Sequence, residues 1–121
     1  EKGFLSSLIT DLLDLDFDVW LTSDHGNIEC QGKGRPAEGV IAETRGERVR
    51  VYPTQELRSQ VSESFPFAHK WEPIGLPSEY FPLVISDREA FVTKGETIVG
   101  HGGISLEEVI VPLIKFSKSD I

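Results

Sequence analysis

The sequence Val19-Trp20-Leu21-Thr22-Ser23-Asp24-His25-Gly26-Asn27 joins a short apolar, β-prone run to a polar end. The run predicts a strand over residues 19–23, with Asp24 and His25 at its carboxyl end. Ligands of open α/β sheets usually bind at that end of a strand. Carboxylates and imidazoles are also ligands of zinc and manganese. The stretch therefore predicts an α/β protein with a metal or catalytic site here; the alternative is an Asx turn of Asp24 that only ends the strand.

Gly26 and Asn27 follow the two candidate ligands directly. Gly26 can adopt a positive φ, so the chain can turn sharply here without moving the ligands. Asn27 is placed either to donate a hydrogen bond to a substrate oxygen or to cap the turn.

An amphipathic helix is predicted before this strand. Apolar side chains recur at helical spacing, with polar side chains on the other side; the apolar residues are Phe4, Leu5, Leu8, Ile9, Leu12, Leu13 and Leu15. A helix, a tight connection and an apolar strand are half of a parallel βαβ unit. No strand precedes this helix, so we expect the chain to start in the middle of a larger sheet. Trp20 is expected in the core.

Composition and charge exclude several classes of protein. The chain has 121 residues, 39% hydrophobic and 26% charged, which suits one soluble domain with a modest core. No segment approaches the roughly 20 apolar residues that cross a bilayer, and no signal peptide is visible. Cys30 is the only cysteine, so a reducing, cytoplasmic location is expected. The net charge of −8 argues against a large phosphate-tracking surface and leaves a small anionic substrate open.

The region after the first motif predicts a loop and two short strands. Residues 27–38 are glycine-rich and polar, which indicates a loop. Residues 40–42 and 48–52 predict strands that join around a glycine. Arg48 and Arg50 alternate with valines, so we expect them on a solvated face.

A helix, an irregular segment and a hairpin are predicted next. Thr54 is a suitable N-cap for a helix over residues 55–62. Residues 64–82 contain four prolines and predict irregular structure. Residues 83–86 and 90–93 predict the two strands of a hairpin. Aromatic side chains are expected to pin the irregular segment to the core: Phe65, Phe67, Trp71, Tyr80 and Phe81.

A second motif lies near the end of the chain, in Gly100-His101-Gly102-Gly103-Ile104-Ser105-Leu106-Glu107-Glu108. Ser105 and Glu108 form a capping box, which predicts a helix start and fixes the loop before it. The glycines allow a metal or phosphate to approach His101 closely. The apolar run that follows is an edge strand or is broken at Pro112.

Together, these motifs resemble the alkaline phosphatase superfamily: Asp24-His25-Gly26, a long insertion, then His101-Gly102-Gly103. Within it, residues 22–26 and residues 101–113 are most similar to the PglZ domain, which occurs in bacterial and archaeal phage-defence systems of the BREX type and in some response regulators. Cofactor-independent phosphoglycerate mutases share both signatures. The resemblance covers most of the chain, but residues 31–99 carry little of it.

The resemblance implies a two-metal site that holds zinc or manganese. Asp24 and His25 would bind one ion and His101 the other. The serine or threonine nucleophile, its aspartate partner and a further ligand pair would precede Glu1. The expected fold is α/β: residues 1–121 would be the carboxy-terminal portion of an alkaline phosphatase-like sheet flanked by helices, with short added strands. The chain alone would then be inactive.

The implied function is metal-dependent hydrolysis of a phosphomonoester or phosphodiester, with nucleotides and nucleic acids among the candidate substrates. Asn27, Lys33 and Arg35 are candidate substrate-binding residues, since two cations follow the first motif. His69 has no partner at ligand spacing and is expected to be structural or exposed. The alternatives are a phosphomutase, a non-catalytic interaction module of a defence complex, or an unrelated α/β domain.

Overall fold

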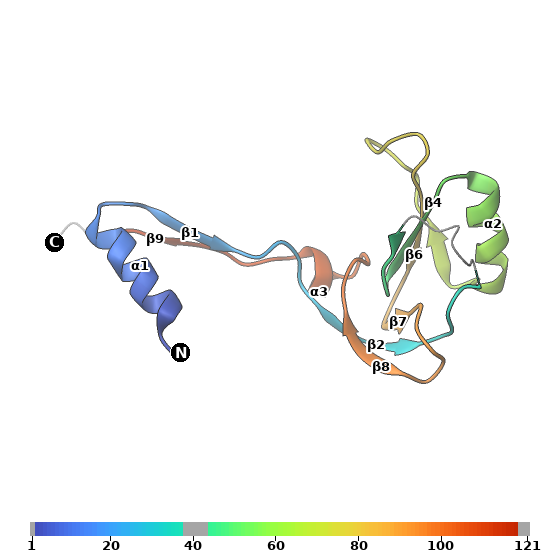
Figure 1. Ribbon diagram of the computed structural model, residues 1–121, viewed down its shortest axis with the longest axis horizontal. Helices are drawn as coiled ribbons and strands as arrows, with labels where there is room; N and C mark the ends of the chain where they lie inside the picture. Colours follow the sequence, from blue (N-terminus) through green and yellow to red (C-terminus); the bar gives the residue numbers. More distant parts are fainter. Residues whose placement is uncertain (1, 38–43, 119–121) are drawn as a thin grey trace. The chain divides into compact units, whose positions relative to one another are not determined.

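The computed structural model describes residues 2–37 and 44–118, so the predicted strand at residues 40–42 lies outside the described residues (Figure 1). The described elements confirm a mixed α/β protein. In chain order they are α1 (Phe4–Asp14), β1 (Val19–Thr22), β2 (Ile28–Gly32), β3 (Thr44–Arg45), β4 (Val49–Tyr52), α2 (Gln55–Ser64), β5 (Ala68–Lys70), β6 (Phe81–Ile85), β7 (Glu89–Ala90), β8 (Thr97–Gly100), α3 (Leu106–Val109) and β9 (Leu113–Phe116).

The chain divides into two compact units, which are described separately. Unit 1 comprises Glu1–Asp24 and Val111–Ile121, and unit 2 comprises His25–Ile110. None of the described helices is long and apolar enough to span a membrane.

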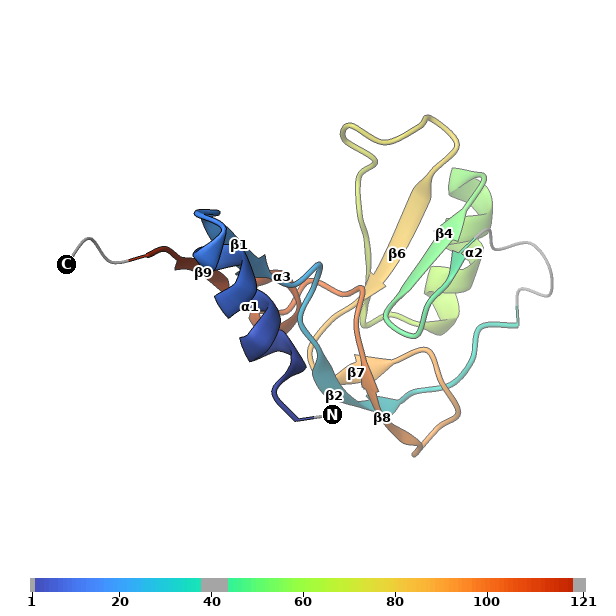
Figure 2. The same cartoon turned by 60° about the vertical axis from the view of Figure 1, so that its left-hand side comes forward.

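Unit 1 contains the predicted amphipathic helix and the strand that follows it. α1 lies beside β1 and β9 (Figure 2). β1 pairs antiparallel with β9, with Val19 opposite Phe116 and Thr22 opposite Leu113. The pairing partner of β1 among the described residues is thus antiparallel, whereas the helix–strand order predicted a parallel one. β9 begins directly after Pro112, as the break predicted at this proline requires.

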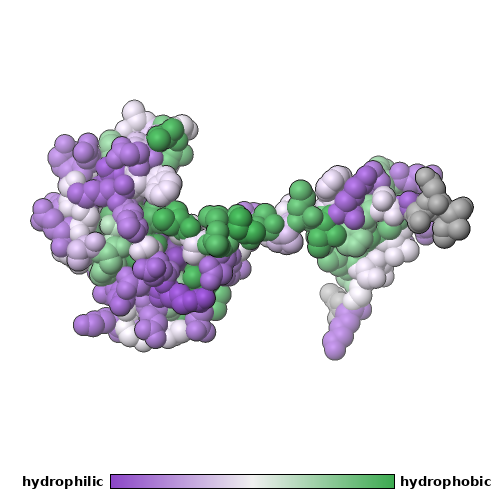
Figure 3. All heavy atoms as spheres, turned by 180° about the vertical axis from the view of Figure 1, so that it is seen from behind, coloured by the Kyte–Doolittle hydropathy of each residue, from purple (hydrophilic) through white to green (hydrophobic). Residues whose placement is uncertain are grey.

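Unit 1 leaves much apolar surface accessible, and none of its described residues is buried. Apolar side chains are visible on the face of the α1, β1 and β9 region drawn in Figure 3. The expectation that Trp20 lies in the core is wrong, because its side chain is 59% exposed. Successive strand residues point to opposite faces, and Leu21 takes the face that lines a groove against α1. Trp20 therefore points to the other face, where Lys115 Nζ lies 5.6 Å from its ring centroid.

The first sheet of unit 2 has the order β7-β2-β8. β2 occupies residues for which the sequence predicted a loop, and that prediction is wrong. Ile28 and Cys30 are buried, whereas Glu29 and Gln31 are exposed, so the period-two pattern of a half-buried strand is present. The pattern is difficult to recognise in the sequence because glycines and polar residues lie on both sides of this short run. The buried residues pack with Ala90, Val92 and Ile98.

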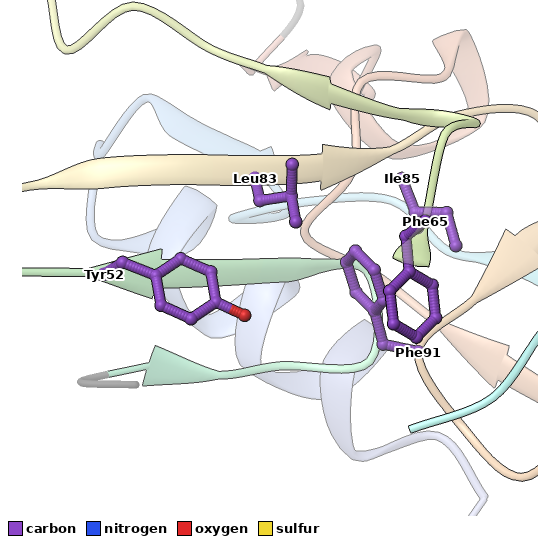
Figure 4. Packing of buried hydrophobic residues seen from close by; sticks show 5 residues of the cluster. All are labelled: Tyr52, Phe65, Leu83, Ile85 and Phe91. Carbon is purple, nitrogen blue, oxygen red and sulfur yellow. The ribbon is translucent and has the colours of Figure 1, made fainter. Parts of the chain in front are cut away.

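The second sheet of unit 2 has the order β3-β4-β6-β5, and α2 packs on it. Thr54 caps α2 as predicted, because its hydroxyl accepts a hydrogen bond from the Leu57 amide. Figure 4 shows the core between these elements, which consists of Tyr52, Phe65, Leu83, Ile85 and Phe91. The rings of Phe65 and Phe91 meet edge to face with centroids 5.4 Å apart. This core fixes the positions of β4 and β6.

The predicted hairpin after residue 82 is wrong. β6 pairs with β4 and β5, and β7 pairs with β2 in a parallel arrangement. The chain turns at Asp87, which has a φ of 48°, and then enters the other sheet. Of the aromatic residues expected to pin residues 64–82, Phe65 is buried, but Trp71 is 50% exposed at the start of a surface loop.

Two isoleucines of unit 2 test this core, because Ile85 is fully buried and Ile74 is 91% exposed. We expect Ile85→Ala to lower the free energy of unfolding by about 2–5 kcal/mol, since it removes packed methyl groups and leaves a cavity. Ile74→Ala should change it by less than about 0.5 kcal/mol. Urea unfolding followed by Trp71 fluorescence in a Trp20→Phe background reports unit 2 alone. Equal effects of the two substitutions would contradict this assignment of the core.

Candidate functional site

Antiparallel pairing of β2 with β8 brings the two histidine motifs together. Ile28, three residues after His25, lies opposite Gly100 in the ladder. Gly100 directly precedes His101. The two imidazole rings stack, with centroids 3.7 Å apart and planes 11° apart. His25 is half-buried and His101 is exposed. Residues 76 positions apart in sequence thus form one pair of candidate ligands.

One hydrogen bond orients the His25 ring. Its Nδ1 lies 2.8 Å from the carbonyl oxygen of Gly26. Because a carbonyl only accepts hydrogen bonds, Nδ1 carries the proton, and the lone pair remains on Nε2. Metal-binding histidines typically donate their second ring N–H in this way. His25 is therefore in a form suited to bind a metal through Nε2.

The stacked geometry favours two ions over one. An imidazole nitrogen donates its lone pair in the plane of the ring, and one ion cannot lie in the planes of two stacked, nearly parallel rings. The ring pair thus suits one ion on His25 and a second on His101.

The pair supplies only part of such a centre. Among residues 2–37 and 44–118, no group of three or more His, Cys, Asp or Glu side chains is arranged to hold a metal ion. Catalytic zinc normally has three protein ligands. A metal centre at this place would therefore need ligands besides the two histidines.

Glu108 connects both histidine motifs. Its carboxylate accepts hydrogen bonds from the Gly103 amide at 2.8 Å and from the amide and hydroxyl of Ser105 at 3.2 and 2.7 Å. This arrangement confirms the predicted capping box and the start of α3. The main-chain oxygen of Glu108 accepts from the Gly26 amide at 2.8 Å. The side chain thus holds the loop after His101, and the backbone holds the residue after His25.

Arg48 forms a buried, bidentate ion pair with Glu108. Nε lies 3.0 Å from Oε1 and Nη2 lies 2.8 Å from Oε2, and the two side chains are 0% and 1% exposed. Nη1 donates to the main-chain oxygens of Ser86 and Glu89. Arg50 is also buried, at 7% exposed, so the expectation that Arg48 and Arg50 face solvent is wrong. Buried guanidinium groups are tolerated here because carboxylate and carbonyl oxygens accept their hydrogen bonds.

The ion pair changes the acidity of Glu108. Burial by itself raises the pKa of this carboxyl, but the hydrogen bonds from Arg48, Ser105 and Gly103 outweigh burial and lower the pKa to about 2. Glu108 therefore stays ionised throughout the physiological pH range.

Gly26 is required for close packing. It is absent from the described glycines with positive φ, so the left-handed turn that a glycine permits does not occur here. A Cβ atom at Gly26 would lie 1.8 Å from the main-chain oxygen of Glu107. At Gly103 a Cβ atom would lie 2.7 Å from Arg48 Nη2 and from a carboxylate oxygen of Glu108. The glycines of both motifs thus let α3 and the ion pair approach the backbone.

The other predicted site residues do not converge on the histidine pair in unit 2. Asn27 is exposed beside it, directly before β2. Lys33 and Arg35 lie beyond the other end of β2, a strand roughly 16 Å long. They form ion pairs with Glu89 at 3.0 Å and Glu96 at 3.9 Å. Their placement does not favour the substrate-binding role predicted for them.

Asp24 is the last residue of the first segment of unit 1, and its side chain is exposed. Its role as a ligand stays a prediction. His69 is exposed on β5, and Cys30 is buried in β2, where burial raises the pKa of its thiol. A buried thiol with a raised pKa is a poor metal ligand.

The sequence did not reveal the role of Arg48. The capping box identified Glu108, but its second partner lies 60 residues away in a strand-like stretch. One local signal was present. A capping-box glutamate that follows a glycine-rich histidine loop indicates that a buried carboxylate accepts hydrogen bonds from that loop.

These observations define a mixed α/β protein in which two histidine motifs, far apart in sequence, meet in one place. The family model for the BREX system PglZ alkaline phosphatase-like domain matches residues 2–116. The chain therefore belongs to the PglZ family. No match was found among curated proteins or among solved structures.

The close packing at Gly26 leads to one prediction. We expect Gly26→Ala to destabilise unit 2 by about 1–3 kcal/mol, because the new methyl group collides with the backbone of α3. Asn27→Ala, at the adjacent exposed position, should have an effect below about 0.5 kcal/mol. The same fluorescence-detected urea unfolding measures both. An unchanged free energy of unfolding in Gly26→Ala would show that the backbone of α3 does not pack closely against this residue.

The low pKa of Glu108 leads to a second prediction. Because the folded value of about 2 lies below the ordinary value of 4.5, the ionised carboxylate stabilises the fold above pH 4.5, and this contribution is lost as the pH falls towards 2. It amounts to about 3 kcal/mol. Urea unfolding between pH 5.5 and 2.5 should show this loss in the wild type and a smaller one in the doubly apolar variant Arg48→Met/Glu108→Leu. Equal losses in both proteins would refute it.

Proposed function

We propose that this PglZ domain contributes His25 and His101 to the two-metal centre of a phosphoesterase. The observation that carries the proposal is the stacked ring pair, whose parallel planes suit two ions. Asp24 is proposed as a second ligand of the ion on His25. Zinc or manganese fits this mixture of imidazole and carboxylate donors.

The residues of this chain serve the chemistry by holding the donors in place. When bound, two divalent ions stabilise the attacking and leaving oxygens of an in-line displacement at phosphorus. The Gly26 carbonyl keeps the proton of His25 on Nδ1, so Nε2 remains a donor. Asn27 is exposed next to the pair, and its amide is proposed to donate to a non-bridging oxygen of the substrate.

The proposed substrates are phosphomonoesters or phosphodiesters, with nucleotides and nucleic acids among them. We propose that the protein acts in the cytoplasm as part of a phage-defence system of the BREX type. The family match supports this setting.

The test uses the full-length gene product with added zinc or manganese. Turnover of p-nitrophenyl phosphate and bis(p-nitrophenyl) phosphate is measured for the wild type, His25→Ala, His101→Ala and the control His69→Ala. His69 is exposed on β5. We expect metal-dependent turnover to fall at least about 100-fold in the two site variants, since loss of an outer-sphere partner alone costs about 10–100-fold in metal affinity or activity. His69→Ala should behave as the wild type.

The outcome separates the function classes. Metal-dependent turnover that is lost in both site variants supports the esterase and ranks the two substrate classes. A folded protein that binds neither metal contradicts the proposal and favours an interaction module. Equal losses in all three variants would show that the effects are unrelated to the ring pair.

A further inference from the structure

We infer that Arg48 and Glu108 are positioning residues that hold the two histidine rings in their stacked arrangement. The expected effect of this positioning on metal affinity rests on the proposed function, whereas its effect on the arrangement of the two rings does not. Arg48 comes from the insertion between the two motifs, residues 31–99, so the inference gives this region a role in the site.

Glu108 is the direct link. Its side chain and main chain together accept hydrogen bonds from Gly103, Ser105 and Gly26. Gly103 lies two residues after His101, and Gly26 is adjacent to His25. A displacement of Glu108 therefore moves both ring-bearing segments relative to each other.

Arg48 anchors Glu108 to the rest of unit 2. Its main-chain oxygen accepts from the Ile85 amide at 3.0 Å, which ties it to β6. Its Nη1 donates to carbonyl oxygens of Ser86 and Glu89, which hold the side chain from the opposite end. The backbone of Arg48 is thus tied to β6, and its guanidinium is tied to the backbone between β6 and β7, so Arg48 transmits the position of these strands to Glu108.

The loop that carries His101 needs such an anchor. Gly102 has a φ of 98°, and Gly103 follows it, so the backbone here has little conformational preference of its own. His101 is exposed, and its ring stacks on the ring of His25. Without the hydrogen bonds to Glu108, the loop would populate many conformations, and apparent metal affinity falls with the fraction in the competent one.

A purely stabilising role makes a different prediction. Replacing a buried ion pair with apolar side chains of similar volume is often neutral or stabilising, so stability alone does not need the charges. Apolar side chains cannot accept hydrogen bonds from Gly103 and Ser105. The variant Arg48→Met/Glu108→Leu therefore separates a positioning role from a structural one.

The experiment compares this variant with Arg88→Met/Glu107→Leu. The control removes an ion pair of 3.0 Å from the neighbouring position of the same helix, where both side chains are exposed. Folding is checked by near-UV circular dichroism. Nuclear Overhauser contacts between the ring protons of His25 and His101 are recorded without metal, and zinc binding is measured by calorimetry on the full-length protein.

We expect Arg48→Met/Glu108→Leu to fold, to lose the contacts between the rings and to bind zinc at least 10-fold more weakly. The control should keep both properties. A folded double variant with intact ring contacts overturns the inference. If the wild type shows ring contacts but binds no zinc, the proposed function fails, and the ring contacts of the variants still decide the positioning role.

Two single variants keep the test decisive if the double variant does not fold. Arg48→Lys keeps the charge but loses the bidentate geometry, and Glu108→Gln keeps one acceptor oxygen but loses the charge. We expect each to weaken the ring contacts and zinc binding by an intermediate amount relative to Arg88→Lys and Glu107→Gln. Wild-type ring contacts in both folded single variants would overturn the inference.

Discussion

The buried ion pair between Arg48 and Glu108 is the interaction on which the site in unit 2 depends. Desolvating two charges is costly, and the cost is offset only where every donor and acceptor is used. Here the remaining acceptor capacity of the carboxylate is taken up by Gly103 and Ser105, and the remaining guanidinium donors by backbone oxygens. Those bonds hold the glycine-rich loop that carries His101, so the charge pair gives this loop geometric order.

The strand pairing and the ion pair make separate contributions to the position of the two histidine rings. Antiparallel pairing of β2 with β8 brings His25 and His101 into the same region, but a ladder sets backbone register only. Ring orientation is set locally, by the Gly26 carbonyl for His25 and by the anchored loop for His101. The two levels together give two nearly parallel rings, which is the geometry on which the proposed two-metal centre rests.

Local signals in the sequence predicted local structure well. The apolar spacing of α1, the N-cap at Thr54 and the capping box of Ser105 each involve residues within four positions of one another, and each was confirmed. The family resemblance carried by the two histidine motifs was also confirmed. Errors arose where a partner lies far away in the sequence. The burial of Arg48 depends on a carboxylate 60 residues later, and no periodicity reveals it. β2 was missed because turn-forming residues surround a strand of five.

The pairing of β1 with β9 has an evolutionary consequence. Thr22 and Leu113 are opposite each other in one ladder, yet the 86 residues of unit 2, His25–Ile110, lie between them in the chain. Adjacent antiparallel strands are about 5 Å apart, so the chain leaves the ladder of unit 1 and re-enters it at nearly the same place. A segment inserted in this way can be lengthened, shortened or exchanged without a change in the register of the host strands. His25 and His101 thus both lie in a segment whose length can change without altering the pairing of β1 with β9.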